Sequence, residues 1–303
     1  MFTKDSKILS HRLTTPLTAV ANAVGDVFAT AVGDVFKPTY NQLIKSLFAN
    51  NEQGFVYDPN DLSTMYQDAA GTVPVTGAGQ PVGLIKDKSG RNNHAVQTTS
   101  ASRPILKKDD VTGVYYLEFD GVDDSLKTNN INFTVTDKIS VFAGQQTYLP
   151  SNVGTIVETV VGYSSPSGGF VVWSPITYSA ELSKYTVGAG VSGGNGIFFS
   201  GAVPADNLKS TISLAADLSK TLKDEQVQFR VDGYRKFTTA NSTIVAGSSF
   251  ANVPICIGSR NSTSNRFKGR IYGLIGVGRL TTESEIVAIE KELAKRTGAT
   301  LNV

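Results

Sequence analysis

Between residues 111 and 280 the chain consists of short apolar runs separated by turn-forming residues, and this pattern constrains the fold more than any other feature. The runs either alternate apolar with polar residues or are continuously apolar, and turn signals separate them at intervals of roughly 8 to 15 residues. Short strands at this spacing are typical of an antiparallel β-sandwich. The strands predicted in this way are Tyr115–Phe119, Ile139–Phe142, Gly154–Gly162, Phe170–Trp173, Thr211–Ala215, Val227–Val231, Ile255–Ile257 and Ile271–Val277.

Two local patterns sharpen this prediction. Asp232 and Gly233 lie between two strand-like arms, and type I′ hairpin turns favour this dipeptide because both central residues need a positive φ. Near the end of the chain, residues 282–297 predict a helix. Thr281 or Thr282 acts as its N-cap, and Glu285 lies three residues after Thr282, as in a capping box. Gly298 follows the last turn, where a left-handed residue ends a helix.

The first 50 residues differ from the rest and contain an eight-residue repeat, Ala23–Phe28 and Ala31–Phe36. Apolar positions three or four apart predict an amphipathic helix, with a strand–turn–strand segment as the weaker alternative. Pro38 would end that helix, and a second short helix is expected over 39–49. The segment is too small to form its own core, so it packs either on the sandwich or on another copy or a larger assembly. We favour the second option, and the candidate assembly residues are Val24, Val27, Phe28, Val32, Val35 and Phe36.

Residues 51–110 are rich in loop-forming residues and predict an extended lead-in that partly joins the sandwich, which itself spans 111–303. The 28 basic and 26 acidic residues are interspersed, which gives no support for a nucleic-acid partner. Cys256 is the single cysteine, so a disulfide framework is excluded and a buried thiol is expected. We see no signal peptide and no apolar stretch long enough to cross a membrane, and we expect no membrane insertion.

Four motifs in order resemble concanavalin A-like lectin/glucanase domains of the laminin G-like type. They are Phe119–Asp124, the turn at Val231–Gly233, the loop from Ile257-Gly258 to Phe267–Tyr272, and Arg279–Glu285. The resemblance covers about residues 80 to 300 and implies a mainly β fold, a concanavalin A-like jelly-roll β-sandwich. With the segments above, we expect a short helical N-terminal appendage and a C-terminal helix.

The lead-in also resembles the front end of laminin G-like proteins of tailed bacteriophages and prophages. The similar segments are Tyr57–Thr64, Gln67–Val75, Gly79–Gly83, Asp87–His94 and Ala101–Pro104. This resemblance implies a virion structural protein of the tail, baseplate or fibre, with capsid decoration or a head fibre as the alternative location. Such a protein would be made in the host cytoplasm and would contact other virion proteins. We expect a homo-oligomer. We expect a trimer because fibres and capsid decoration proteins are commonly trimers, and no residue of this sequence specifies that number.

The sequence lacks the pattern of carboxylates that a sandwich glycosidase would need. Sandwich glucanases carry three carboxylates on one strand face as Glu-x-Asp-x-Glu, and no such triplet occurs here. Glu158 stands isolated in its apolar run, and Asp224 and Glu225 are adjacent, so they would face opposite sides of a strand. We therefore expect a protein that is not an enzyme and has no cofactor.

Two kinds of binding site remain as candidates. Asp120, Asp123 and Asp124 form the densest acidic cluster, which offers oxygen ligands for Ca²⁺, although residues of this kind more often form turns. Exposed aromatic rings beside polar loops suit a host surface glycan, and large aromatic residues in a sandwich more often belong to the core. The candidate glycan-binding residues, which flank the predicted loops at 164–169 and 174–184, are Tyr163, Trp173, Tyr178 and Tyr185.

Overall fold

The computed structural model of the protein describes residues 39–148, 153–160, 168–177, 182–190, 197–204, 208–235 and 249–302. Leu43–Val303 forms one compact unit. The six apolar residues predicted to mediate assembly, from Val24 to Phe36, lie outside the described residues, and so do Tyr163 and Tyr178. The assembly role of the first 50 residues therefore stays a prediction.

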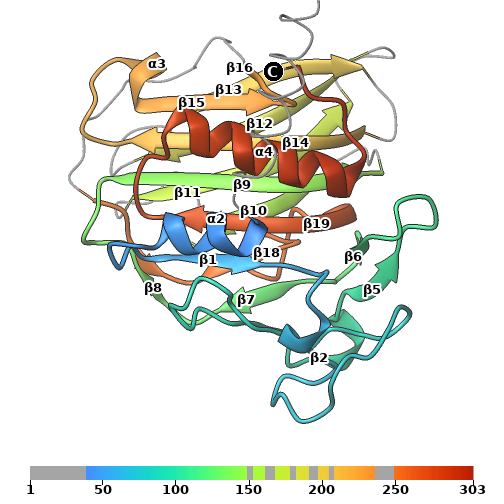
Figure 1. Ribbon diagram of the computed structural model, residues 1–303. Coiled ribbons are helices and arrows are strands. Elements are labelled where there is room, and N and C mark those ends of the chain that lie inside the picture. The colour runs from blue at the N-terminus through green and yellow to red at the C-terminus, as the bar shows by residue number, and fades with distance from the viewer. Residues whose placement is uncertain are drawn as a thin grey trace, which may run out of the picture. The chain divides into compact units, whose positions relative to one another are not determined.

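Two antiparallel sheets stack to form the body of the protein (Figure 1). The front sheet carries, in spatial order, β16 (Tyr234–Arg235), β15 (Val227–Val231), β14 (Leu208–Asp217), β9 (Lys138–Thr147), β19 (Lys268–Val277), β6 (Tyr115–Asp120) and β5 (Ile105–Lys108), and β1 (Gly54–Tyr57) also pairs with β19. The back sheet carries β13 (Ile197–Pro204), β12 (Leu182–Gly190), β11 (Gly169–Thr177), β10 (Thr155–Thr159), β18 (Ile255–Ile257), β7 (Leu126–Thr128), β4 (Ala95–Val96), β3 (Leu84–Ile85) and β2 (Met65–Tyr66).

Shorter elements complete the described chain. A two-stranded ribbon joins β8 (Ile131–Asn132) to β17 (Asn252–Val253). The helices are α2 (Tyr40–Leu47), α3 (Lys223–Gln226) and α4 (Glu283–Thr297), with single 3₁₀ turns at Leu62–Thr64 and Ser100–Ser102. Within these described residues, no helix is both long enough and apolar enough to span a bilayer.

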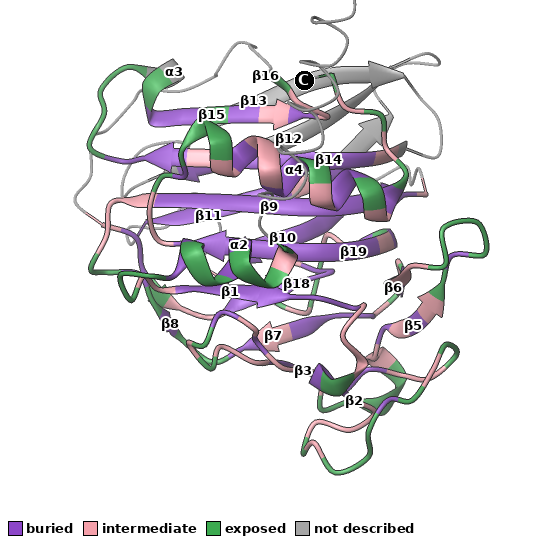
Figure 2. Cartoon of the chain, viewed as in Figure 1, coloured by how far each residue is buried: buried purple, intermediate pink, exposed green. Residues whose placement is uncertain are grey.

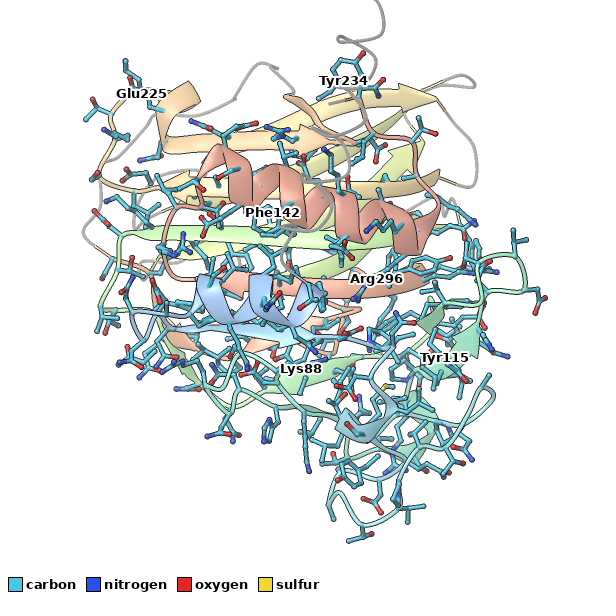
Figure 3. The ribbon with its side chains drawn as sticks, viewed as in Figure 1. Lys88, Tyr115, Phe142, Glu225, Tyr234 and Arg296 are labelled. Atoms are coloured by element: carbon cyan, nitrogen blue, oxygen red, sulfur yellow. The ribbon has the colours of Figure 1, made fainter. Side chains whose placement is uncertain are left out.

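The core lies between the two sheets, because alternate residues of each strand point inward. Strand β9 is buried along almost all of its length (Figure 2). Its residues Ile139, Val141 and Ala143 join the core, whereas Phe142 lies on the other face, toward α4 (Figure 3). Large rings fill the space between the sheets, and burying each of them contributes about 1.5–3 kcal/mol. The largest fully buried core rings are Phe55, Phe119, Phe133, Phe170, Phe229, Phe250 and Phe267.

Helix α4 covers the outer face of the front sheet at a point where the sheet lacks side chains (Figure 1). A Cβ added at Gly144 or at Gly273 would lie 3.3 or 3.1 Å from Leu293 of the helix, so these glycines allow close packing. The helix begins with the predicted capping box between Thr282 and Glu285 and ends at Gly298, whose φ is 75°. The closing helix and its caps are therefore confirmed.

Helix α2 lies in front of β1 and β19 in Figure 1, and Phe48, which follows it, lies against Gly54 of β1. Leu43, Ile44, Leu47 and Phe48 are buried, with Leu47 completely inaccessible to solvent. The Arg279 Nε atom donates to the Leu47 carbonyl oxygen at 3.4 Å. This part of the segment assigned to docking thus belongs to the sandwich unit.

The lead-in contributes strands to both sheets, and its polar motifs tie these strands together. The buried Asp87 carboxylate accepts the backbone N–H groups of Val56 at 2.8 Å and Asn93 at 3.0 Å. Asp58 forms an ion pair with Arg296 of α4 at 2.7 Å, and Figure 3 labels that arginine at the end of the helix. Asp58, Asp87 and Asn93 therefore have structural roles in the fold.

The predicted mainly β jelly-roll sandwich with a C-terminal helix is confirmed. The hairpin is confirmed as well, since Asp232 and Gly233 have φ values of 51° and 81° between β15 and β16. One loop prediction was wrong. Residues 174–177 continue β11, and residues 182–184 begin β12, because the two strands pair through Thr177 and Ser183.

Candidate functional site

Trp173 is the one predicted glycan-binding residue whose side chain the structure describes. It lies on β11 of the back sheet and is half-buried. Tyr185 lies on the neighbouring strand β12, opposite Gly201 of β13, and its side chain is outside the described set. The site is therefore built around Trp173.

The face of the back sheet that points away from the core carries a row of chemically distinct residues. Glu158 of β10 is paired with Val171 of β11 on one side and with Cys256 of β18 on the other. Cys256 is paired in turn with Lys127 of β7. The neighbours of these residues along the strands, such as Ile255 and Ile257, enter the core, so the row lies on the opposite face.

Glu158 joins Trp173 and Arg260 into one cluster. The Trp173 indole N–H donates to Glu158 Oε2 at 3.0 Å. The Arg260 guanidinium forms two parallel hydrogen bonds with the same carboxylate, from Nε to Oε1 at 3.1 Å and from Nη2 to Oε2 at 3.3 Å. The guanidinium carbon also lies 5.0 Å from the centre of the indole ring, within the range of a cation–π contact.

The three side chains differ sharply in burial. Glu158 is completely buried, whereas the Arg260 side chain is 34% exposed and Trp173 is half-buried. Burying a carboxylate costs several kcal/mol unless it is paired and hydrogen-bonded, and here both oxygens have partners. The carboxylate therefore acts as an internal anchor that fixes the orientation of an indole ring and a guanidinium nearer the surface.

The connection between β18 and β19 places Arg260 over this face. Gly258 has a φ of 79°, and its carbonyl oxygen accepts the Phe267 N–H at 2.9 Å, which closes the loop. Within the loop, the Arg260 N–H donates to the Ser264 carbonyl oxygen at 2.7 Å. Lys127 Nζ donates to Asn261 Oδ1 at 3.0 Å and so attaches the loop to β7.

Sequence reasoning missed two of the three residues in this cluster. Glu158 was considered only as a catalytic carboxylate, and Arg260, which binds it across 102 positions of the chain, was not considered. The available signal was the acidic residue in the middle of a buried apolar run, since such a group needs a partner of opposite charge. No local pattern indicates which of the 28 basic residues supplies that partner.

The predicted acidic cluster is brought together at the turn after β6. Ligand oxygens of Asp120, Asp123 and Asp124 lie within 4.8 Å of one another. Each carboxylate already accepts a hydrogen bond: Asp120 from the Val122 N–H at 2.7 Å, Asp123 from Ser102 Oγ at 2.7 Å, and Asp124 from the Asp120 N–H at 3.0 Å. Burial, with a contribution from the neighbouring carboxylates, raises the pKa of Asp124 to about 6. These contacts are those of a turn, and calcium binding by the three residues remains an untested candidate.

Cys256 lies in the outward row and is completely buried, as predicted for a structural thiol. Burial raises its pKa to about 11. Since the thiolate is the reactive form, this cysteine is poorly suited to nucleophilic chemistry at neutral pH.

Comparisons with known proteins give structural similarity only. No family model and no curated protein sequence matches the chain. An arabinofuranosidase bound to arabinofuranosyl-α-1,2-xylobiose superposes with a TM-score of 0.49 at 12% identity, covering 72% of this chain and 51% of the enzyme. Domain 4 of an extracellular arabinanase from Geobacillus stearothermophilus, in complex with arabinotriose, gives 0.46 at 13%, covering 79% and 98%.

A third similar structure is the carbohydrate-binding module of a Ruminococcus gnavus sialidase bound to α2,3-sialyllactose. Its TM-score is 0.35 at 13% identity, covering 51% of this chain and 83% of the module. The chain spans about half the length of the arabinofuranosidase. At such identities and TM-scores these proteins carry no conclusion about what this chain binds.

Proposed function

We propose that the protein is a non-enzymatic, lectin-like interaction protein that binds a glycan at the Trp173 face of the back sheet. The observation that carries this proposal is the completely buried Glu158, which holds Trp173 and Arg260 in place. A hydrophobic residue at this position would cost less to bury than a carboxylate. The charged anchor is explained if a fixed geometry of the ring and the guanidinium is what the site requires.

The two oriented groups match the chemistry of a sugar. The apolar face of a pyranose ring packs on an indole, while its hydroxyl groups accept hydrogen bonds from a guanidinium. Because both groups are held by their own partners, little side-chain freedom is lost when a ligand binds. The site therefore suits binding of a sugar. It does not suit catalysis by Glu158, because both oxygens of that carboxylate already accept hydrogen bonds from the protein.

The test is a screen of the full chain against bacterial surface polysaccharides, followed by variants. Trp173→Ala is expected to weaken binding at least tenfold, and Trp173→Phe to weaken it less, because the ring is kept and the indole N–H is lost. Tyr234→Ala is the matched control, since this tyrosine is 54% exposed on β16 at an edge of the other sheet (Figure 3). If Trp173→Ala and Tyr234→Ala bind as the wild type does, the assignment of the site fails.

Catalysis is the competing function for a sandwich of this kind. Glycoside hydrolysis requires two carboxyl groups flanking the scissile bond. The Glu158 carboxylate has its two oxygens occupied by Trp173 and Arg260 and no contact with solvent. Release of reducing ends from any polysaccharide that the protein binds would overturn the non-enzymatic part of the proposal.

We also propose that the sandwich is displayed on a bacteriophage particle as a virion structural protein. The support comes from the sequence, namely the lead-in segments that resemble phage proteins and the apolar repeat between Ala23 and Phe36. In this role the N-terminal segment binds the particle or sister subunits in an oligomer, for which we expect a trimer. Particles assembled with the chain lacking residues 1–38 should not contain the protein, and normal incorporation would overturn the docking role.

A further inference from the structure

The guanidinium of Arg260 is engaged along one edge only. Its Nε and Nη2 atoms bind Glu158, and its Nη1 atom makes no hydrogen bond within the described part of the chain. The side chain is 34% exposed, so this free edge is not enclosed by the fold. An arginine fixed in this way keeps donors available in a defined direction.

Among the described residues of the site, the charged groups that reach the surface are cations. The negative charge of Glu158 is fully buried and is neutralised by Arg260. Lys127 belongs to the same outward row, one strand beyond Cys256, and its Nζ donates to the neutral Asn261 side chain. No carboxylate in the described residues lies within ion-pair distance of Lys127, so its charge is not compensated locally.

We infer that the glycan bound at Trp173 is acidic and that its carboxylate pairs with the free edge of Arg260. This inference rests on the proposed glycan-binding function and adds the chemical class of the ligand. Arg260 Nη1 supplies a charge-assisted hydrogen bond to the sugar carboxylate, a stronger contact than one to a hydroxyl group. Lys127 adds attraction from the same face, and the indole ring receives the apolar side of the sugar.

The experiment uses the full wild-type chain and pairs of polysaccharides that differ in one group. Alginate, polygalacturonate and a sialylated glycan are each immobilised beside a form whose carboxyl groups have been reduced to alcohols. At least one acidic form is expected to bind at least tenfold more tightly than its reduced partner. The difference should shrink as the salt concentration rises from 50 to 500 mM, because partly exposed charges are screened, over about 10 Å at 0.1 M salt.

Variants then assign the effect to the two cations. Lys127→Gln, which leaves the buried pair of Glu158 and Arg260 intact, should lower affinity for the acidic form about twofold to fivefold and lower affinity for the reduced form by a smaller factor. Arg260→Lys keeps the charge but loses the planar edge, and it should reduce the preference for the acidic form further. Circular dichroism of each variant verifies that the sandwich remains folded.

The outcomes separate this inference from the function on which it rests. Equal binding of acidic and reduced forms overturns the preference for acid and leaves glycan binding intact. A sulfated glycan without carboxyl groups is immobilised as a further probe, and binding to it that equals binding to the carboxylated glycans overturns the assignment of a carboxylate. Absence of binding to all forms of all polysaccharides overturns both proposals together.

Discussion

At the scale of single residues, Glu158 and Arg260 form an ion pair but differ in burial. Substituting each residue should therefore reduce the stability of the fold by a different amount. Glu158 has no exposed surface, while Arg260 is one-third exposed. Arg260→Gln leaves a buried carboxylate without its charge partner, and we expect it to reduce the free energy of unfolding by about 3–5 kcal/mol. Glu158→Gln leaves a guanidinium that water can reach, and we expect a loss of about 1–2 kcal/mol.

Urea unfolding of the two variants and of the double variant measures these values. The double variant should be more stable than Arg260→Gln alone, because the unpaired charge is gone. Lys295→Gln serves as the control, since its ion pair with Glu292 is on the surface and the lysine is 72% exposed. Equal losses for the two single variants would contradict the role of Glu158 as a buried anchor.

Asp124 is expected to make the stability of the fold depend on pH. Burial raises the pKa of this carboxyl group to about 6 from an ordinary value of 3.8. The folded state therefore binds the proton more tightly than the unfolded state, and the stabilisation is complete below pH 3.8 and is lost as the pH rises to about 6. Asp124→Asn should match the wild type near pH 3.5 and exceed its stability by about 2–3 kcal/mol above pH 6.5.

Unfolding by urea between about pH 1.5 and 7.5 checks this prediction and its control. Asp109→Asn is a control of opposite sign, because backbone hydrogen bonds, with Thr112 first, lower the pKa of Asp109 to about 2. That variant should lose stability at neutral pH and approach the wild type below pH 2. A rise in melting temperature on adding Ca²⁺ at pH 7 that the wild type shows and Asp124→Asn lacks would show that the acidic cluster binds the metal.

At the scale of elements, the connection between β18 and β19 carries Arg260 and depends on Gly258. This glycine has a φ of 79°, and an added Cβ would lie 2.3 Å from the Phe119 ring. Gly258→Ala should therefore cost about 3 kcal/mol or more, from left-handed strain and from overpacking. It should also weaken glycan binding by displacing the loop.

Gly90 provides the matched control for this variant. Its φ is 82°, but nothing lies within 4 Å of a Cβ built there. Gly90→Ala should cost only the backbone strain, about 1 kcal/mol, and leave binding unchanged. Thermal unfolding of both variants separates strain from steric clash, and equal losses would show that contact with Phe119 is unimportant.

The same elements show what the sequence could predict and what it could not. The turn at Asp232–Gly233 and the capped helix after Thr282 depend on residues close together in the chain, and both were predicted. The Glu158 cluster depends on a pairing between β10 and the loop after β18, whose register no local pattern specifies. Strand β13, Ile197–Pro204, was not among the predicted strands.

At the scale of the whole molecule, the boundary between the sandwich and the N-terminal segment gives a further prediction. Leu43, Ile44, Leu47 and Phe48 are buried within the compact unit that begins at Leu43. A chain beginning at Asn51 loses these four side chains and exposes the surface beneath them. At about 1.5–3 kcal/mol for each large side chain, we expect a loss of several kcal/mol and a clearly lower melting temperature.

A chain beginning at Thr39 keeps these contacts and is the matched comparison. We expect it to melt at the temperature of the full chain and, by light scattering, to have the mass of a monomer while the full chain is an oligomer. That result would assign assembly to residues 1–38 and stability to α2. If the chain from Thr39 keeps the mass of the full chain, the apolar repeat is not the assembly element. If the chain from Asn51 has the same melting temperature as the full chain, α2 does not stabilise the sandwich, and the stabilisation inferred from its buried apolar residues is wrong.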